Sequence, residues 1–307
     1  MGIWRRLITS GGQVEPFIFK ITTTSSNQTF VLPVTAPNGN QPNFVVNWGD
    51  GNEDTITSTT SLDLTHTYTT ANTYTVSIEG FCEGFQVNNN ASYRGLYVEV
   101  VDWGNVGLKR IDFYGCNNLT TLPVDGSGNA TNNVGLSTVE RFDNTFYGTG
   151  ITSIPIGLFD YAVNAISFTN TFTFVLGLSG NAIPSALFDN NTNVRLFSGT
   201  FNACLNLTTI PNNLFDNNTL VQNFSSVFRN CRSLTAIPSQ LFTNNQNVTT
   251  FSNAFNMATT SNSLTGTTPA DANGDEIWER TPTPLGTDCF AFCTGLSNFA
   301  SIPVSFK

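Results

Sequence analysis

The most evident shortage in this chain of 307 residues is charge: only 11% of its residues are Asp, Glu, Lys or Arg. Soluble proteins usually carry about a quarter. The 12 basic and 21 acidic residues give a net charge of −9 without any basic block, which excludes nucleic acid and anionic membranes as expected partners. No apolar run approaches the roughly 18–20 residues of a transmembrane helix, so membrane insertion is not expected. A polar surface built from Asn, Thr and Ser is more typical of extracellular or particle-borne proteins.

Residues that commonly carry chemistry are also scarce. The chain has one histidine, His66, and it lacks a nucleophile-elbow motif, a phosphate-binding glycine loop and a carboxylate pair that stands out as acid and base. Of its six cysteines only Cys289 and Cys293 are close in sequence, and no second pair or nearby histidine completes a zinc site. We therefore expect no enzymatic activity, no cofactor and no bound metal.

A short phrase returns five times in the second half of the chain: two phenylalanines four residues apart, followed in the first four copies by Ile-Pro and then Leu-Phe. Equivalent residues are 26 to 29 apart, which is the period of units that bury their apolar faces against their neighbours. The Phe, Cys, Leu and Ile positions should therefore point inward. The pairs are Phe142/Phe146, Phe168/Phe172, Phe197/Phe201, Phe224/Phe228 and Phe251/Phe255.

Cysteine recurs three residues after a Phe, and we expect these thiols to be reduced and buried in one column. Small or medium side chains replace cysteine at this position in three other units. The cysteines are Cys116, Cys204, Cys231 and Cys293, and the replacements are Thr149, Val175 and Ala258. Asn-rich tracts after Leu-Phe are expected to form one polar edge, so that replacing Asn218 would change little.

The clearest unit reads Phe-Ser-Ser-Val-Phe-Arg-Asn-Cys-Arg-Ser-Leu-Thr-Ala-Ile-Pro-Ser-Gln-Leu-Phe over residues 224–242. It resembles the BspA-type leucine-rich repeats of bacterial surface proteins, whose units read Phe-x-x-Cys-x-x-Leu-x-x-Ile-Pro-x-x-Leu-Phe. The resemblance implies a leucine-rich-repeat solenoid with short strands and turns over residues 102–307. It would contain an insertion at 256–288, where Trp278 covers the open end of the stack, and a C-terminal cap.

The first half is predicted to be a β-sandwich, because strands alternate with turn signals every 8–15 residues. The expected strands cover residues 17–23, 29–34, 44–48, 62–68 and 73–78. Three spaced motifs, Trp48-Gly-Asp-Gly51, His66-Thr-Tyr68 and Thr73-Tyr-Thr-Val76, resemble the PKD family of immunoglobulin-like domains. The resemblance implies an immunoglobulin-like β-sandwich over residues 16–101, and the fold class as a whole is mostly β.

Three polar features allow more than one interpretation. Asp50 could be catalytic or bind calcium, but a carboxylate in a Gly-Asp-Gly turn more often accepts bonds from backbone N–H groups, and we favour that role. His66 is expected to be a packed, hydrogen-bonded residue beside Tyr68. The stretch from Asp271 to Glu276 has some features of a calcium loop, but its spacing departs from the standard pattern and favours a polar turn.

Residues 1–15 are predicted to be an anchor segment that forms an assembly interface. Its cluster of aromatic, aliphatic and arginine side chains is typical of interface cores, although Trp4 could instead fold back on the sandwich. No apolar stretch of a signal peptide follows the arginines. Either a leader has been removed, or the protein leaves its cell by another route, and the initial Met and Gly11-Gly12 favour a natural N-terminus. The interface residues are Ile3, Trp4, Arg5, Arg6, Leu7 and Ile8.

Together these features predict a non-catalytic structural and display protein on the surface of a bacteriophage virion, such as a head or tail fibre or decoration protein. The N-terminal segment would bind other virion proteins and the solenoid would contact a host surface protein or glycan; a homo-oligomer is compatible with this arrangement. The alternative is a bacterial cell-surface adhesin or glycan-binding protein, which would be extracellular. A third hypothesis is a purely architectural spacer.

Overall fold

The computed structural model describes residues 15–125, 135–271 and 273–307, and the predicted anchor residues 3–8 lie outside these ranges. The protein is mostly β, as expected, with several antiparallel sheets and five short 3-10 helices. The elements are β1 (Phe17–Thr22), β2 (Gln28–Val31), β3 (Val34–Thr35), β4 (Asn43–Asn47), β5 (Glu53–Ile56), η1 (Leu62–Leu64), β6 (Thr65–Tyr68), β7 (Thr73–Phe81), β8 (Gly84–Gln86), η2 (Val87–Asn89), η3 (Ala91–Leu96), β9 (Tyr97–Asp102), β10 (Arg110–Asp112), η4 (Phe299–Ser301) and η5 (Val304–Phe306).

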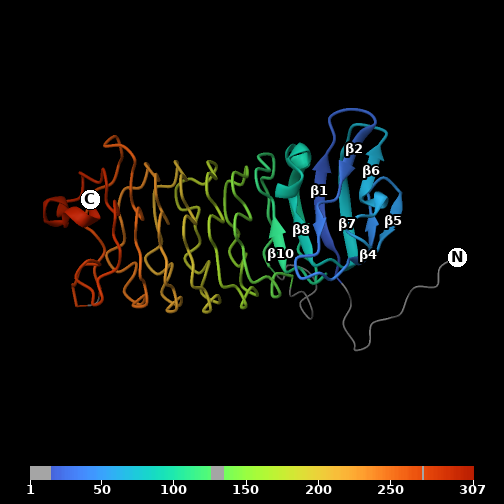
Figure 1. Ribbon diagram of the computed structural model, residues 1–307. Helices are drawn as coiled ribbons and strands as arrows, with labels where there is room; N and C mark the ends of the chain where they lie inside the picture. The colour runs from blue at the N-terminus through green and yellow to red at the C-terminus, as the bar shows by residue number, and fades with distance from the viewer. Residues whose placement is uncertain (1–14, 126–134, 272) are drawn as a thin grey trace.

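A five-stranded sheet in the order β5-β4-β7-β1-β9 forms the first part of the molecule, and its neighbouring strands are antiparallel. Alternate side chains of β1, namely Phe17, Phe19 and Ile21, are buried, as the period of two residues in a strand requires. The ribbon β2-β6 and the sheet β10-β8-β3 complete this part. Figure 1 shows these strands together at one end of an elongated molecule.

The predicted strands at 17–23, 44–48 and 73–78 are present with small shifts of their ends. The prediction of one strand over 29–34 is wrong, because the chain breaks at Leu32-Pro33 into β2, which pairs with β6, and β3, which pairs with β8. The prediction of one strand over 62–68 is wrong for its first three residues, which form η1. The Ser61 hydroxyl accepts a hydrogen bond from the Asp63 N–H and caps this turn, and the chain becomes extended only at Thr65. The strands β5, β8 and β9 were not predicted from the sequence.

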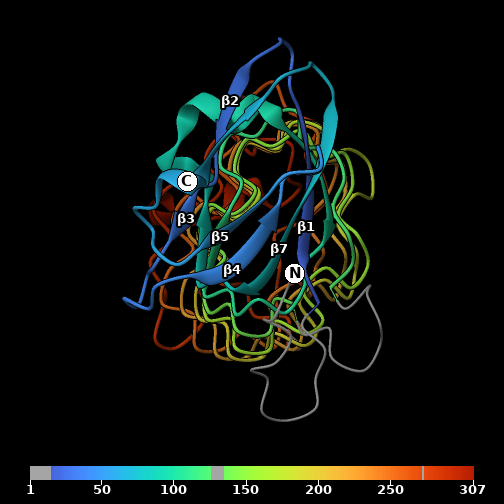
Figure 2. The same cartoon turned by 90° about the vertical axis from the view of Figure 1, so that its right-hand side faces the viewer.

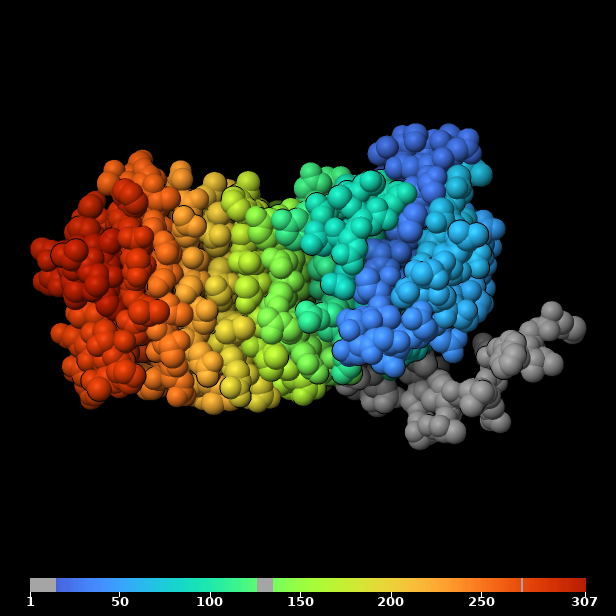
Figure 3. Space-filling model, in the orientation of Figure 1, coloured from blue at the N-terminus to red at the C-terminus, as the bar shows by residue number. Residues whose placement is uncertain are grey.

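The repeat units lie on one another in parallel register. Successive units are joined by single parallel β-bridges, and the end-on view shows their chain paths nearly superimposed (Figure 2). The bridges connect Arg110, Arg141, Ser167, Leu196, Asn223, Thr250 and Leu285 in turn. The units form a continuous body with the first sheets, because β10 pairs in parallel with β8 (Figure 3).

Columns of phenylalanine run through the interior of the stacked units, as the repeat pattern predicts. Equivalent rings in neighbouring units lie 5.0–6.4 Å apart with planes within 19° of parallel. Every Phe of the five pairs is buried. Each such ring contributes about 1.5–3 kcal/mol by its removal from water, so each unit depends on its neighbours for stability.

The first four units turn twice through the left-handed region of the backbone, two residues after each Phe of the pair. In the unit of Phe224 and Phe228 these residues are Ser226 (φ 58°) and Asn230 (φ 60°). The first turn is occupied throughout by residues that tolerate this conformation: Asn144, Asn170, Gly199, Ser226, Asn253 and Asp288. The second turn forms a corner that faces solvent, and its occupants are more varied.

The final unit shows two departures from the expected pattern. The assignment of Ala258 to the buried column is wrong: Ala258 is exposed at a left-handed turn (φ 56°), and Met257 fills the column one residue earlier. Residues 256–288 are longer than the corresponding part of other units but keep pairing with the preceding one. Ser263 and Thr265 donate backbone N–H bonds to Arg232 and Thr235, at 3.0 and 2.9 Å. Trp278 packs on Phe290 and Phe306 at the end of the stack.

Candidate functional site

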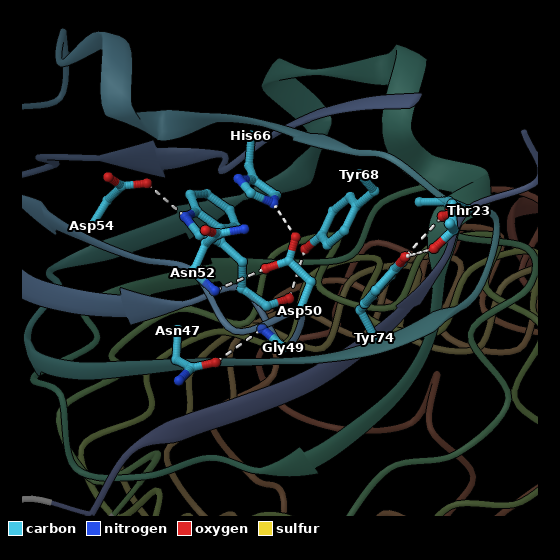
Figure 4. A network of polar contacts seen from close by, with 11 residues as sticks. Thr23, Asn47, Gly49, Asp50, Asn52, Asp54, His66, Tyr68 and Tyr74 are labelled. Carbon is cyan, nitrogen blue, oxygen red and sulfur yellow. Dashed lines mark hydrogen bonds and ion pairs between the residues drawn. The ribbon is translucent and has the colours of Figure 1, made fainter. Parts of the chain in front are cut away.

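The turn that follows β4 places Asp50 beside His66, the chain's one histidine (Figure 4). His66 Nε2 lies 2.7 Å from Asp50 Oδ2, and Asp50 Oδ1 accepts the Asn52 N–H at 3.1 Å. The His66 ring stacks on Trp48, with centroids 4.8 Å apart and planes within 9°. The predicted roles of Asp50 as a turn cap and of His66 as a packed residue are therefore confirmed.

The electrostatics of this turn favour a structural role. Burial acts to raise the pKa of Asp50, but the hydrogen bonds from His66 and Asn52 outweigh it and hold the pKa below its usual value. Burial also raises the pKa of Tyr68, whose hydroxyl donates to the Trp48 carbonyl at 2.9 Å. The ionised Asp50 and the neutral Tyr68 thus each form hydrogen bonds that join the turn between β4 and β5 to β6.

The calcium-like stretch forms a polar turn. Asp271 Oδ1 accepts backbone N–H groups from Asn273 and Asp275, at 2.7 and 3.0 Å. The Glu276 carboxylate faces away from it and accepts bonds from Thr268 and Asn298, at 2.6 and 2.9 Å. Within residues 15–125, 135–271 and 273–307, no group of three or more His, Cys, Asp and Glu side chains is arranged to hold a metal ion.

All six cysteines are free and buried, as expected for the four in the repeat column. Burial raises the pKa of Cys204 and Cys293 to about 12, so these thiols are neutral at ordinary pH and are poor nucleophiles. Their Sγ atoms donate instead to carbonyl groups of the preceding unit: Cys204 to Phe172 at 3.2 Å and Cys293 to Phe255 at 3.1 Å. The column of thiols joins units and offers no reactive site.

A buried column of asparagines was missed by the sequence interpretation. Asn191, Asn218 and Asn245 are fully buried, and each donates both amide hydrogens to two carbonyl groups of the preceding unit. The expectation that Asn218 lies on the polar edge is therefore wrong. Its Nδ2 lies 3.0 Å from the carbonyl oxygens of both Phe188 and Asn191.

Arg280 ends this column by taking the place of the next asparagine. Its guanidinium donates to the carbonyl groups of Phe242 and Asn245, at 2.8 and 3.0 Å, which are the equivalents of those that Asn245 binds one unit earlier. The guanidinium also lies 5.6 Å from the centre of the Phe251 ring. The planar guanidinium of an arginine can donate to two fixed carbonyl groups at once, so Arg280 satisfies the carbonyl groups at the end of the asparagine column.

The second left-handed corner exposes an aromatic row on the surface. Tyr114 and Tyr147 stack with centroids 4.4 Å apart, and Phe174 follows Tyr147 at 5.7 Å. The Arg94 guanidinium lies 4.9 Å from the centre of the Tyr114 ring. No motif in the sequence had pointed to this row, because Tyr114 and Tyr147 come one residue after a buried Phe, whereas Phe174 comes two residues after one.

Comparison with known proteins adds no identification. The chain matches no protein-family model. No curated protein is significantly similar to it in sequence. The described residues also include no helix that is long and apolar enough to cross a membrane.

Proposed function

We propose that this protein is a non-catalytic structural and display protein of a bacteriophage virion, in which stacked repeats present an outward surface to the host. The observation that carries the proposal is that histidine and cysteine side chains, which often perform catalysis in other proteins, have structural roles here. The chain's histidine, three of its cysteines and the three buried asparagines hold units or strands together. The surface edges repeat from unit to unit and remain available for contacts.

In this proposal residues 16–101 are an immunoglobulin-like β-sandwich of the PKD type. The residues that suggested the resemblance gather in one corner, which supports it. Trp48 lies against His66, Tyr68 donates to the Trp48 carbonyl, and Tyr74 stacks on Tyr68 with ring centroids 4.1 Å apart.

Residues 102–307 are, in the same proposal, a BspA-type leucine-rich-repeat solenoid with a C-terminal cap. The parallel bridges and the phenylalanine columns support this assignment. Residues 1–15 would attach the protein to other virion proteins, and the solenoid would bind a host surface protein or glycan. The protein would then reside on the virion surface.

Mass spectrometry of purified particles from the source tests the location, and binding of fluorescently labelled full-length protein to host cells tests the display role. We expect the chain to be present in particles at a constant copy number and to bind host cells in a saturable way. Its absence from particles, combined with detection on the bacterial surface, would favour the alternative of a cell-surface adhesin or glycan-binding protein. Presence in particles without any binding to host cells would leave only a spacer role.

A further inference from the structure

The exposed corner of the repeat units forms a continuous strip that we call the aromatic edge. It consists of Arg94, Tyr114, Tyr147, Phe174, Leu176, Leu205, Arg229 and Arg232. Backbone bonds join its successive corners: Gly115 to Tyr147, Gly148 to Thr173, Phe174 to Asn202 and Ala203 to Arg229, at 2.7–2.9 Å. The strip therefore runs along the stack over five successive corners.

Phe174 is held in an unfavourable backbone conformation at this edge. Its φ of 58° is one that L side chains rarely adopt, and Gly115, Gly148, Ala203, Asn230 and Phe292 occupy the equivalent position in other units. The Phe174 side chain remains 47% exposed, and the neighbouring Leu176 is 48% exposed. A bulky ring in a strained conformation that is only half buried indicates a role in contacting another molecule.

The charges of the aromatic edge are all positive, although the protein as a whole carries a net charge of −9. No Asp or Glu occurs in residues 144–152, 170–178, 199–207 and 226–234, which contain four of the five corners, whereas Arg229 and Arg232 lie there. Asp112, beside the first corner, is buried. Aromatic, arginine and leucine side chains without lysine or carboxylates match the composition of protein–protein interface cores.

A different edge of the same units has the complementary composition. Asp160, Asp189 and Asp216 follow Leu-Phe in three successive units, and residues 158–164, 187–193 and 214–220 contain no Lys or Arg. Tyr161, Val163 and Leu220 on this acidic edge are exposed by 41–47%. Burial, together with the charges of Asp216 and Asp160, raises the pKa of Asp189, so an approaching cation would be favoured there.

We infer that the aromatic edge of one molecule docks on the acidic edge of a second copy of this chain. Both edges run along the stack, so Arg229, Arg232 and the exposed Phe174 ring of one copy meet aspartates and exposed apolar side chains of the other. The two patches differ, so the contact is heterologous, and repetition of it gives rings or open arrays. This association is independent of the proposed host-binding role.

Sedimentation velocity of the full-length protein over a range of concentrations tests the inference. We expect the wild-type protein to self-associate, and more weakly at high salt because surface charges are screened. The double variants Arg229→Glu/Arg232→Glu and Asp189→Arg/Asp216→Arg should each associate about tenfold more weakly or worse. An equimolar mixture of the two double variants should associate again, because the arginine variant keeps an intact acidic edge and the aspartate variant keeps an intact aromatic edge.

Two further variants separate docking from folding. Arg195→Glu reverses a charge at an exposed position that is not part of the aromatic edge, with half the net change of a double variant, and association should persist. Phe174→Asn introduces the residue that occupies the equivalent corner at 230, so it should weaken association without lowering the Tm. A wild-type protein that stays monomeric at every concentration, or a mixture of the two double variants that fails to associate, would overturn the inference; loss of host-cell binding alone would not support it.

Discussion

Asn218 is fully buried, and both of its amide hydrogens are donated to carbonyl groups of the preceding unit. Each of these carbonyl groups also accepts a backbone N–H, so replacing Asn218 with alanine removes two side-chain hydrogen bonds, each worth about 0.5–1.5 kcal/mol. We expect Asn218→Ala to lower the free energy of unfolding accordingly in urea titrations. Asn217 is the matched control, because it is adjacent, identical and exposed, and its replacement should shift stability by no more than about 0.5 kcal/mol. Equal effects of the two substitutions would contradict the buried column.

Asp50 makes the stability of the first sheets depend on pH. Its pKa in the folded protein is lower than its usual value of 3.8, so the folded state favours the ionised form. The stabilisation is present above the pKa of the unfolded chain and is lost as the pH falls through the folded pKa. Asp50→Asn should therefore be less stable than wild type at pH 7, and the difference should shrink below about pH 3.8. Unfolding curves at both pH values measure it, and a difference that stays constant with pH would contradict the role of the carboxylate charge.

At the scale of the repeat unit, the stabilising interactions run from one unit to the next. Phe228 stacks between Phe201 and Phe255, with ring centroids 5.4 and 5.8 Å away, and contacts Phe215 as well. Removing such a ring takes contacts from several units at once. This is the reason that a single unit is not expected to be stable alone.

Phe228→Ala should destabilise the protein by about 3–5 kcal/mol, because it empties one layer of a packed column. Thermal and urea unfolding measure the effect. Arg229→Ala serves as the control at the next residue, which is exposed, and it should change stability little. Comparable shifts for the two variants would mean that the inward and outward positions are assigned the wrong way round.

At the scale of the whole molecule, one hydrophobic core extends from the first sheets into the last repeat unit. Phe85 of β8 and Tyr97 of β9 both contact Phe113, and Phe113 stacks on Phe146 of the following unit. The first sheets thereby cover one end of the stack. This arrangement leaves the lateral edges of the units free for contacts with other molecules.

Deletion of residues 1–12 tests the proposed anchor. We expect the truncated protein to keep nearly the same melting temperature, because the core begins at Phe17, but to lose incorporation into particles. Melting curves and mass spectrometry of particles provide the two measurements. Normal incorporation of the truncated protein, or its unfolding, would contradict the anchor role.

The sequence alone determined the periodic part of this protein. A phenylalanine pair that recurs every 26 to 29 residues can bury its rings only against equivalent rings, so the inward positions follow from the spacing. The Trp-Gly-Asp turn and its histidine were predictable for a similar reason. Both depend on local chemistry, in which a short carboxylate caps backbone N–H groups and an aromatic neighbour covers the ring.

Only the tertiary structure decided which polar residues are buried and which surfaces are exposed. Asn217 and Asn218 are identical neighbours, and both positions hold asparagine in three successive units, so no pattern separates the exposed one from the buried one. The choice depends on which side chain reaches carbonyl groups contributed by another unit. The aromatic edge likewise depends on tertiary structure, because Arg94 of η3 and the aromatic residues of several units come together only after the units have stacked. Contacts between distant segments leave no local pattern in the sequence, whereas a buried ring that recurs in every unit leaves a periodic one.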